Sequence, residues 1–282
     1  MNKLSVVFAT RNEEKNIGRC LESVKELASE IIVIDEHSSD KTVEIAKKYG
    51  AKTFLEPHND NFHITKQKAM EKATSEWILQ LDADEVLSPE LAEEILEVLK
   101  DTHKPKINRL FKRHQSLLEA RAGGIGKPTG EVVGYFIPRR NVFLGKPLIH
   151  AGVYPDGVIR LVKNGKAHFP QKSVHEQITL EGEVSWLSSD ILHYDSPSFE
   201  RYLSRLNRYT DLQKDEFEQK KLSRNLLVLL YYSFIKPPLV FTKLYVRHKG
   251  FLDGMRGFVW SLFSSLHFPI AYFKYWAEGG KN

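Results

Sequence analysis

The chain is poor in cysteine and does not open with a leader-like segment. Cys20 is the only cysteine among 282 residues, which excludes an internal disulfide and suits a reducing compartment. Residues 1–10 lack the long apolar core of a signal peptide and are typical of a strand that starts almost at once. We therefore expect a cytoplasmic amino terminus. No internal repeat or low-complexity tract is evident.

Long uninterrupted apolar runs are also missing. Residues 226–246 are apolar, but Pro237 and Pro238 divide them into stretches too short to predict a transmembrane helix. Residues 258–276 are longer and rich in aromatic side chains, yet serines, a histidine and Pro269 interrupt them. We expect this second segment to lie in a membrane interface rather than to span the bilayer.

The positive charge is concentrated at the carboxyl-terminal end. The chain has a net charge of +5, and residues 236–282 contain seven lysines and arginines against two acids, Asp253 and Glu278. This segment therefore accounts for the whole excess. Basic residues clustered with aromatic and aliphatic ones favour an anionic membrane surface over nucleic acid. A helical dimer interface is the alternative for the same segment.

The amino-terminal part alternates strand and helix patterns. The hydrophobic fraction of 41% and the charged fraction of 27% are ordinary for a soluble globular protein. Apolar spacing predicts strands at 4–9, 31–34, 51–55 and 77–81, and helices at 15–28, from 42, at 64–75 and after Ser88–Pro89. This alternation predicts an α/β fold with a parallel sheet covered on both faces.

Later segments break this rhythm. Residues 103–134 read as a basic surface helix followed by a glycine-rich loop, which is either a closing lid or a plain insertion. Residues 135–195 alternate short strands and turns, and residues 199–224 predict a charged amphipathic helix. We therefore divide the chain into a domain of residues 1–225, with parts 1–102, 103–134 and 135–225, and a basic aromatic helical tail of residues 226–282.

The most informative stretch is residues 77–85, an apolar run that ends in three carboxylates. Asp82 and Asp84 are two residues apart, so at an extended strand end they point the same way. Paired carboxylate oxygens suit a hard divalent cation, Mg²⁺ or Mn²⁺. Ligands of parallel sheets bind at the carboxyl ends of strands, where residues 10–14 and 35–40 are also expected. A solvated turn is the alternative for the Asp82–Asp84 pair.

Several motifs together resemble a known family, the nucleotide-sugar-dependent family 2 glycosyltransferases of GT-A fold. The matching segments of the first half are 9–14 (Ala-Thr-Arg-Asn-Glu-Glu), 33–42 (Val-Ile-Asp-Glu-His-Ser-Ser-Asp-Lys-Thr) and the Leu-Asp-Ala-Asp-Glu block. The second half resembles the branch that adds sugars to lipopolysaccharide core, through 139–141, 154–156, 158–161, 174–176 and 192–194. The resemblance implies a Rossmann-like, mostly parallel sheet flanked by helices, followed here by a helical, membrane-associating extension.

The resemblance also implies roles for individual residues. The donor, most simply a UDP-sugar, would be bound by Thr10, Arg11, Asn12, Glu14, Asp35, Lys66 and Asp82. Asp35 would contact the base and Lys66 the diphosphate. Asp82 and Asp84 would hold the metal, with His193 as a further ligand. Glu36–His37 replaces the Asp-Gly common in the broader family, which leaves the identity of the base open.

Sugar transfer from a nucleotide needs a neutralised leaving group and a general base for the acceptor hydroxyl. Glu176 is the expected base and Asp156 its main rival, with Asp84 contributing at the metal. Glu176 and His193 each have an ordinary structural alternative. Glu176 could lie on a solvated strand face, and His193 could be a structural histidine rather than a metal ligand.

The sequence thus predicts an inverting, metal-dependent glycosyltransferase at the cytoplasmic face of the cell membrane. Its acceptor would be a lipid-linked saccharide or a lipopolysaccharide-type core, and no nucleic acid is expected as a partner. A polyprenyl-phosphate sugar transferase and a non-catalytic sugar-nucleotide-binding protein are the alternatives. A nucleotidyltransferase would be expected to carry a glycine-rich phosphate loop after the first strand, and Thr10–Glu14 is not one.

Overall fold

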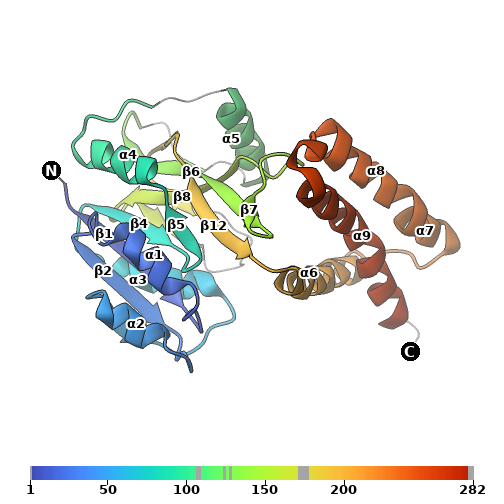
Figure 1. The fold of residues 1–282 in the computed structure, drawn as a ribbon, viewed down its shortest axis with the longest axis horizontal. Coiled ribbons are helices and arrows are strands. Elements are labelled where there is room, and N and C mark those ends of the chain that lie inside the picture. The colour runs from blue at the N-terminus through green and yellow to red at the C-terminus, as the bar shows by residue number, and fades with distance from the viewer. Residues whose placement is uncertain (1, 106–108, 123–124, 127–128, 171–177, 279–282) are drawn as a thin grey trace. The chain divides into compact units, whose positions relative to one another are not determined.

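A computed structural model describes residues 2–105, 109–122, 125–126, 129–170 and 178–278 (Figure 1). The chain forms two compact units. The first comprises Met1–Arg140 and Pro155–His193, and the second comprises Asn141–Tyr154 and Tyr194–Asn282. The domain boundaries expected above remain a prediction.

The first unit is built on a mixed sheet. Its strand order is β3-β2-β1-β4-β8-β6-β12-β5, with β11 and β7 both pairing with β6. The strands of the sheet are β1 Leu4–Thr10, β2 Glu30–Asp35, β3 Lys52–Leu55, β4 Trp77–Leu81, β5 Glu85–Leu87, β6 Val132–Phe143, β7 Lys146–Pro147, β8 Asp156–Lys163, β11 Glu183–Trp186 and β12 Ile191–Ser196. Of these, β7 and the last three residues of β6 and of β12 belong to the second unit. A separate two-stranded ribbon joins β9 Ala167–His168 to β10 Thr179–Leu180.

The four strands predicted from the apolar runs are confirmed and form the parallel half of this sheet. β1 runs parallel to β2 and β4, and β2 runs parallel to β3. From β4 onward the direction changes, because β8 runs antiparallel to both β4 and β6. The parallel half brings the carboxyl ends of β1, β2 and β4 to one edge.

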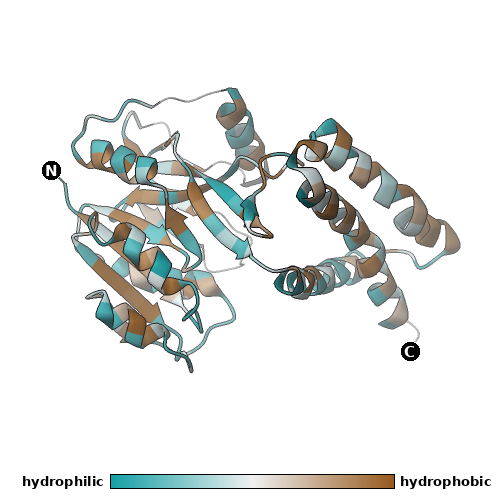
Figure 2. Ribbon diagram, in the orientation of Figure 1, coloured by the Kyte–Doolittle hydropathy of each residue, from teal (hydrophilic) through white to brown (hydrophobic). Residues whose placement is uncertain are grey.

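Helices cover both faces of the sheet, as predicted. The helices of this unit are α1 Ile17–Val24, α2 Thr42–Lys48, α3 Phe62–Glu71, α4 Pro89–Leu99 and α5 Arg109–Ala122. Residues of β1 alternate between two cores: Val6 and Phe8 lie with α1 and α4, whereas Val7 lies with α3 and Phe111 of α5. All seven β1 residues are buried, which explains why the strand is mostly apolar, and the central strands are mostly hydrophobic in colour in Figure 2.

Local sequence signals set several helix ends. Ser88 is the N-cap of α4, and its Oγ accepts a hydrogen bond from the backbone N–H of Leu91 at 3.2 Å. Pro89 occupies the first turn, where no intrahelical donor is needed. The start of this helix agrees with the prediction from the Ser-Pro-Glu sequence.

The second unit is mainly helical. It contains α6 Phe199–Gln219, α7 Leu226–Leu230, a π-helical segment Tyr231–Ile235, α8 Lys236–Thr242, a second π-helical segment Lys243–Arg247, a 3₁₀ turn Gly250–Asp253 and α9 Gly254–Glu278. One of its cores joins Phe217 of α6 to Tyr272 and Tyr275 of α9. Another joins Phe143, Leu148 and Tyr202.

The expectation that Pro237 and Pro238 break the apolar segment is wrong. Residues Leu226–Arg247 form one helical run of 22 residues, long and apolar enough to cross a bilayer by length and composition. The two prolines lie at the start of α8, directly after a π-helical turn. A wider turn is a known way for a helix to accommodate proline, which lacks the N–H of a regular i→i−4 bond.

Candidate active site

Thr10 and Asp35 end neighbouring parallel strands and are paired in register. The Thr10 hydroxyl donates to Asp35 Oδ2 at 2.8 Å, and both side chains are fully buried. Ser38 donates to the same carboxylate twice, from its hydroxyl at 2.6 Å and from its backbone N–H at 2.7 Å. Asp35 therefore remains a fixed hydrogen-bond acceptor at the strand edge.

The loops after β1 and β2 are tied to each other. Asn12 adopts a left-handed backbone conformation (φ 55°), and its side-chain oxygen accepts from the backbone N–H of Ser39 at 2.8 Å. The Asn12 N–H donates in turn to Ser38 Oγ at 2.8 Å. Glu14 accepts from the backbone N–H of Lys41 at 3.1 Å, while Arg11 is exposed. The Thr10–Glu14 turn and the Asp35–Asp40 turn thus form one rigid rim.

Asp82 follows β4 and lies between two cations. Lys66 of α3 approaches Asp82 Oδ1 at 2.6 Å, and Arg160 of β8 bonds to Oδ2. Burial opposes ionisation of Asp82, but the charges of Arg160 and Lys66 outweigh it and hold the pKa of this carboxyl well below its ordinary value. Asp82 is therefore an anion throughout the physiological range.

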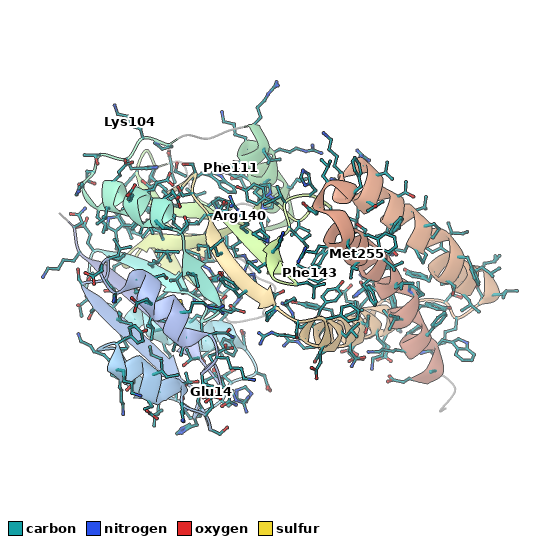
Figure 3. All side chains as sticks on the ribbon, viewed as in Figure 1. Glu14, Lys104, Phe111, Arg140, Phe143 and Met255 are labelled. Atoms are coloured by element: carbon teal, nitrogen blue, oxygen red, sulfur yellow. The ribbon has the colours of Figure 1, made fainter. Side chains whose placement is uncertain are left out.

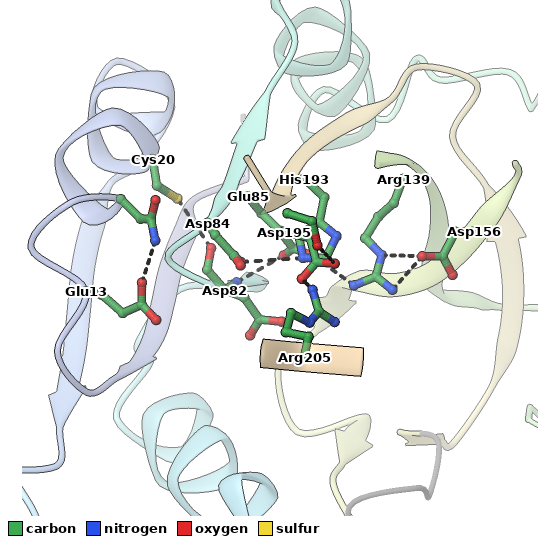
Figure 4. Close-up of polar contacts among 12 residues, drawn as sticks. Glu13, Cys20, Asp82, Asp84, Glu85, Arg139, Asp156, His193, Asp195 and Arg205 are labelled. Carbon is green, nitrogen blue, oxygen red and sulfur yellow. Dashed lines mark hydrogen bonds and ion pairs between the residues drawn. The ribbon is translucent and has the colours of Figure 1, made fainter. Parts of the chain in front are cut away.

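Glu85 organises the loop between β4 and β5. Its Oε2 accepts from the backbone N–H of Asp82 at 3.0 Å, and its Oε1 contacts Arg160 at 2.7 Å and Arg139 at 3.4 Å. Arg139 also forms two hydrogen bonds to Asp156 Oδ2, at 2.7 and 3.0 Å (Figure 4). Burial lowers the pKa of Arg139, and the charges of Asp156 and Glu85 more than compensate and raise it. The result is a chain of alternating charges that joins β4, β6 and β8.

Asp84 points to a different partner from Asp82. Its carboxylate Oδ1 lies 3.6 Å from Nε2 of His193 on β12, and both side chains are partly exposed. A carboxylate oxygen and an imidazole nitrogen at this separation are a donor set that a divalent ion such as Mn²⁺ accepts. Among the described residues of this unit, Asp84 and His193 are thus the pair best placed to hold a metal.

Residues 5–137 match the protein family described as "Glycosyl transferase family 2". The lipopolysaccharide core biosynthesis glycosyltransferase LpsC of Rhizobium meliloti is 26% identical over 277 residues, covering 93% of this chain and 90% of that protein. Residues 5–137 therefore carry the sequence of a family 2 glycosyltransferase domain.

Two further similarities accompany these. The uncharacterized glycosyltransferase RT0209 of Rickettsia typhi is 28% identical over 274 residues, covering 93% of this chain and 82% of that protein. The crystal structure of Staphylococcus aureus TarS residues 1–349 is 16% identical, covers 99% of this chain and 91% of that one, and superimposes with a TM-score of 0.38.

As a family 2 glycosyltransferase, the protein takes a sugar from a nucleotide-sugar donor. The mixed, largely parallel sheet flanked by helices is the α/β arrangement that the resemblance implied. The structure gathers the predicted donor-side residues as two groups. The rim holds Thr10, Arg11, Asn12, Glu14 and Asp35. The second group lies at the end of β4, where Asp82 contacts Lys66 of α3 and Asp84 faces His193.

The predicted base is not among these groups. Glu176 lies outside the described residues, so its role stays a prediction. Asp156, the rival, is described, and its carboxylate is paired with Arg139.

Sequence reasoning missed the counter-charges of the site. It did not foresee that Arg160 and Lys66 both contact Asp82. Arg160 is 78 residues from Asp82 in the chain and reaches it only through the pairing of β8 with β4. Sequence reasoning also missed the buried Glu36, which contacts Thr65 of α3 and His58 (Nδ1 to Oε2, 2.6 Å). The replacement of the family's usual Asp-Gly by Glu36–His37 was the available signal, since a carboxylate directly after a buried strand needs partners.

Proposed function

We propose that this family 2 glycosyltransferase transfers a sugar from a UDP-sugar, with inversion and with the help of Mg²⁺ or Mn²⁺, to a lipid-linked saccharide or lipopolysaccharide-core-type acceptor. The observation that carries the proposal is the set of polar side chains at the carboxyl ends of three parallel strands, Thr10 on β1, Asp35 on β2 and Asp82 after β4. Ligands of such sheets bind at this edge.

Asp35 suits the base of the donor. Its Oδ2 accepts from the hydroxyls of Thr10 and Ser38, whereas Oδ1 accepts only from the Ser38 backbone N–H and keeps acceptor capacity for a further N–H. A uracil ring offers an imide N–H to such an acceptor.

Asp84 and His193 suit the metal, and a bound divalent ion would neutralise charge on the leaving diphosphate. Asp82 is shared between Lys66 and Arg160, and the three groups can exchange partners when a diphosphate arrives. Lys66 is then available to a phosphate oxygen, because a donor phosphate competes with Asp82 for the same ammonium group. The negative charge of Asp82 stays compensated by Arg160 during this exchange.

The acceptor hydroxyl needs a base on the side of the sugar opposite the diphosphate, since direct displacement inverts the anomeric centre. We assign this role to Glu176. Asp156 is the alternative, and its carboxylate is paired with Arg139.

The helical tail supports a site of action at the inner face of the cell membrane. Only 6% of the most apolar window of helix Leu226–Arg247 is buried, and Leu227 and Phe234 are 76% and 71% exposed. Met255, labelled in Figure 3, is 75% exposed at the start of α9. Exposed apolar side chains of this kind beside an excess of lysine and arginine fit an anionic lipid surface.

The transfer is tested by release of nucleoside diphosphate from UDP-sugars, with and without Mn²⁺ or Mg²⁺. We expect metal-dependent release from at least one donor and loss of this dependence in Asp84→Ala. A matched control is Asp101→Ala, a carboxylate beyond α4 at an exposed position. Turnover of Asp84→Ala equal to that of wild type would sink the metal assignment. Glu176→Gln is expected to retain donor binding and lose transfer, whereas full activity would move the base elsewhere.

The membrane surface is tested separately by sedimentation with vesicles. Leu227→Asp combined with Phe234→Asp should abolish binding to vesicles that contain phosphatidylglycerol, and Leu117→Asp, at an exposed leucine of α5, should not. Wild-type protein that stays in the supernatant refutes the membrane assignment. Loss of self-association in the double variant, without any vesicle binding by wild type, would identify the surface as a dimer interface.

A further inference from the structure

The second unit contains a cavity of about 230 Å³. One wall is α6, which presents Tyr202, Arg205 and Tyr209. These residues are three and four positions apart and therefore lie on one face of the helix. The residues that line this cavity are all in the second unit.

The opposite wall is α9, which presents Trp260, Ser264 and His267. The spacing of four and three again selects a single helical face. Because two long helices supply the lining, the cavity is held by regular structure rather than by a loop.

Two aromatic rings form a fixed platform in this cavity. The rings of Tyr202 and Trp260 are 5.8 Å apart and tilted by 34°, and Phe143 packs edge-on against both, at 4.8 and 5.5 Å. Burial raises the pKa of Tyr202 to about 12, against a smaller opposing effect of its hydrogen bond with Ser264. The Tyr202 hydroxyl is therefore neutral and remains a donor.

Polar groups with defined directions stand beside this platform. Asp195, at the end of β12, forms an ion pair with Arg205 (Figure 4). Arg205 also lies over the ring of Tyr209, 5.5 Å from its centroid, and donates to its hydroxyl at 3.3 Å. Burial lowers the pKa of His267, and Lys236 and Lys274 add to this effect against Glu216, so a neutral imidazole with one donor and one acceptor faces the cavity.

This combination discriminates among ligand classes. An acyl or isoprenoid chain would remove water from the Asp195–Arg205 pair and return no hydrogen bonds, which costs free energy. An isolated phosphate would meet the carboxylate of Asp195. A sugar ring has hydroxyls around its edge and C–H bonds on its faces, so it can satisfy the charged pair and also lie on the negative face of an indole ring.

We propose that the cavity between α6 and α9 binds a saccharide ring, stacked on Trp260 and hydrogen-bonded to Asp195 and Arg205. The reading of this ring as part of the acceptor rests on the proposed function, but the binding itself does not. The cavity has room for one ring rather than for an oligosaccharide.

The test uses protein free of donor and metal. Saturation-transfer NMR is recorded with methyl glycosides of glucose, galactose and mannose and with N-acetylglucosamine, each at about 10 mM, because ligands of this size bind weakly. We expect transfer to the ring C–H protons of at least one glycoside. Trp260→Leu should weaken binding at least about tenfold, as expected for an aromatic anchor. Trp276→Leu is the matched control, since Trp276 is on the same helix, 56% exposed and outside the cavity.

Asp195→Asn is a second variant in case Trp260→Leu does not fold. This substitution removes the charge of Asp195 with little change in the shape of the side chain. Weaker binding in Asp195→Asn with an unchanged circular dichroism spectrum supports the proposal. Any one of three results overturns the proposal. These are no saturation transfer to any glycoside, glycoside binding by both cavity variants equal to that of wild type, and displacement of the bound glycoside by a fatty acid but not by a second sugar.

The two proposals fail in different ways. A protein that binds glycosides but never releases nucleoside diphosphate refutes the proposed transfer and leaves the cavity assignment standing. A protein that turns over donor but binds no glycoside in this cavity refutes the cavity assignment alone.

Discussion

Replacement of Arg160 by methionine should destabilise the protein strongly. The guanidinium is 7% exposed and bonds to Gln80, Asp82 and Glu85, and Glu85 is completely buried. The variant leaves Glu85 with Arg139 at 3.4 Å and leaves Asp82 with Lys66. Removal of one partner from a buried ionic group costs about 3–5 kcal/mol, because the remaining charges lose their compensation.

The assay is urea unfolding followed by circular dichroism at pH 7. Lys163→Met is the control, since Lys163 is on the same strand but pairs with the half-exposed Glu131, and an exposed pair is worth about 1 kcal/mol or less. A double variant, Arg160→Met with Glu85→Gln, should recover part of the loss, because the two residues interact directly. A loss below about 1 kcal/mol in Arg160→Met, or strict additivity in the double variant, would refute this account of the network.

The same variant has a defined pH dependence. The folded-state pKa of Asp82 is lowered, so its ionisation stabilises the fold fully above the unfolded value, near 3.9, and progressively less as the pH falls below it. Without Arg160, the folded-state pKa of Asp82 is lowered less. The stability difference between wild type and Arg160→Met should therefore be largest above about pH 4 and should narrow in acid.

Three further predictions concern the first unit and can be checked by urea unfolding. Trp186→Ala should cost about 3–5 kcal/mol, because the indole is stacked between Phe111 and Phe136 at 4.6 and 4.7 Å; a loss under about 1 kcal/mol would contradict this. Burial opposes ionisation of Glu94, but bonds from His103 and the Ser188–Ser189 backbone lower its pKa to about 2, so stability falls as the pH drops from about 4.3 towards 2. Glu94→Gln should reduce this loss of stability in acid, and an unchanged pH dependence of the unfolding free energy would contradict the role given to Glu94. Ser88→Ala should cost about 1 kcal/mol through loss of the α4 cap, whereas Ser116→Ala, on the exposed face of α5, should be nearly neutral.

Much of the parallel half could be predicted because its signals are local. The strands β1, β2 and β4 are each mostly apolar, and the rule that parallel strands end at one edge placed Thr10, Asp35 and Asp82 together. The helix run 226–247 shows the limit of local signals. Proline removes a donor at Pro237 and Pro238, but whether the helix stops depends on whether neighbouring turns can adjust.

The sequence by itself determined which side chains meet at the sheet edge and, with its motif order, the family. Only the tertiary structure decided which partners Asp82 and Asp84 contact. The antiparallel pairing of β8 with β4, with Leu161 opposite Leu79, brings Arg160 beside Gln80 and onto Asp82, although 78 residues separate the pair. Asp84 instead faces His193. The register between distant strands has no local signature, so the charges that control these carboxylates could not be read from the chain alone.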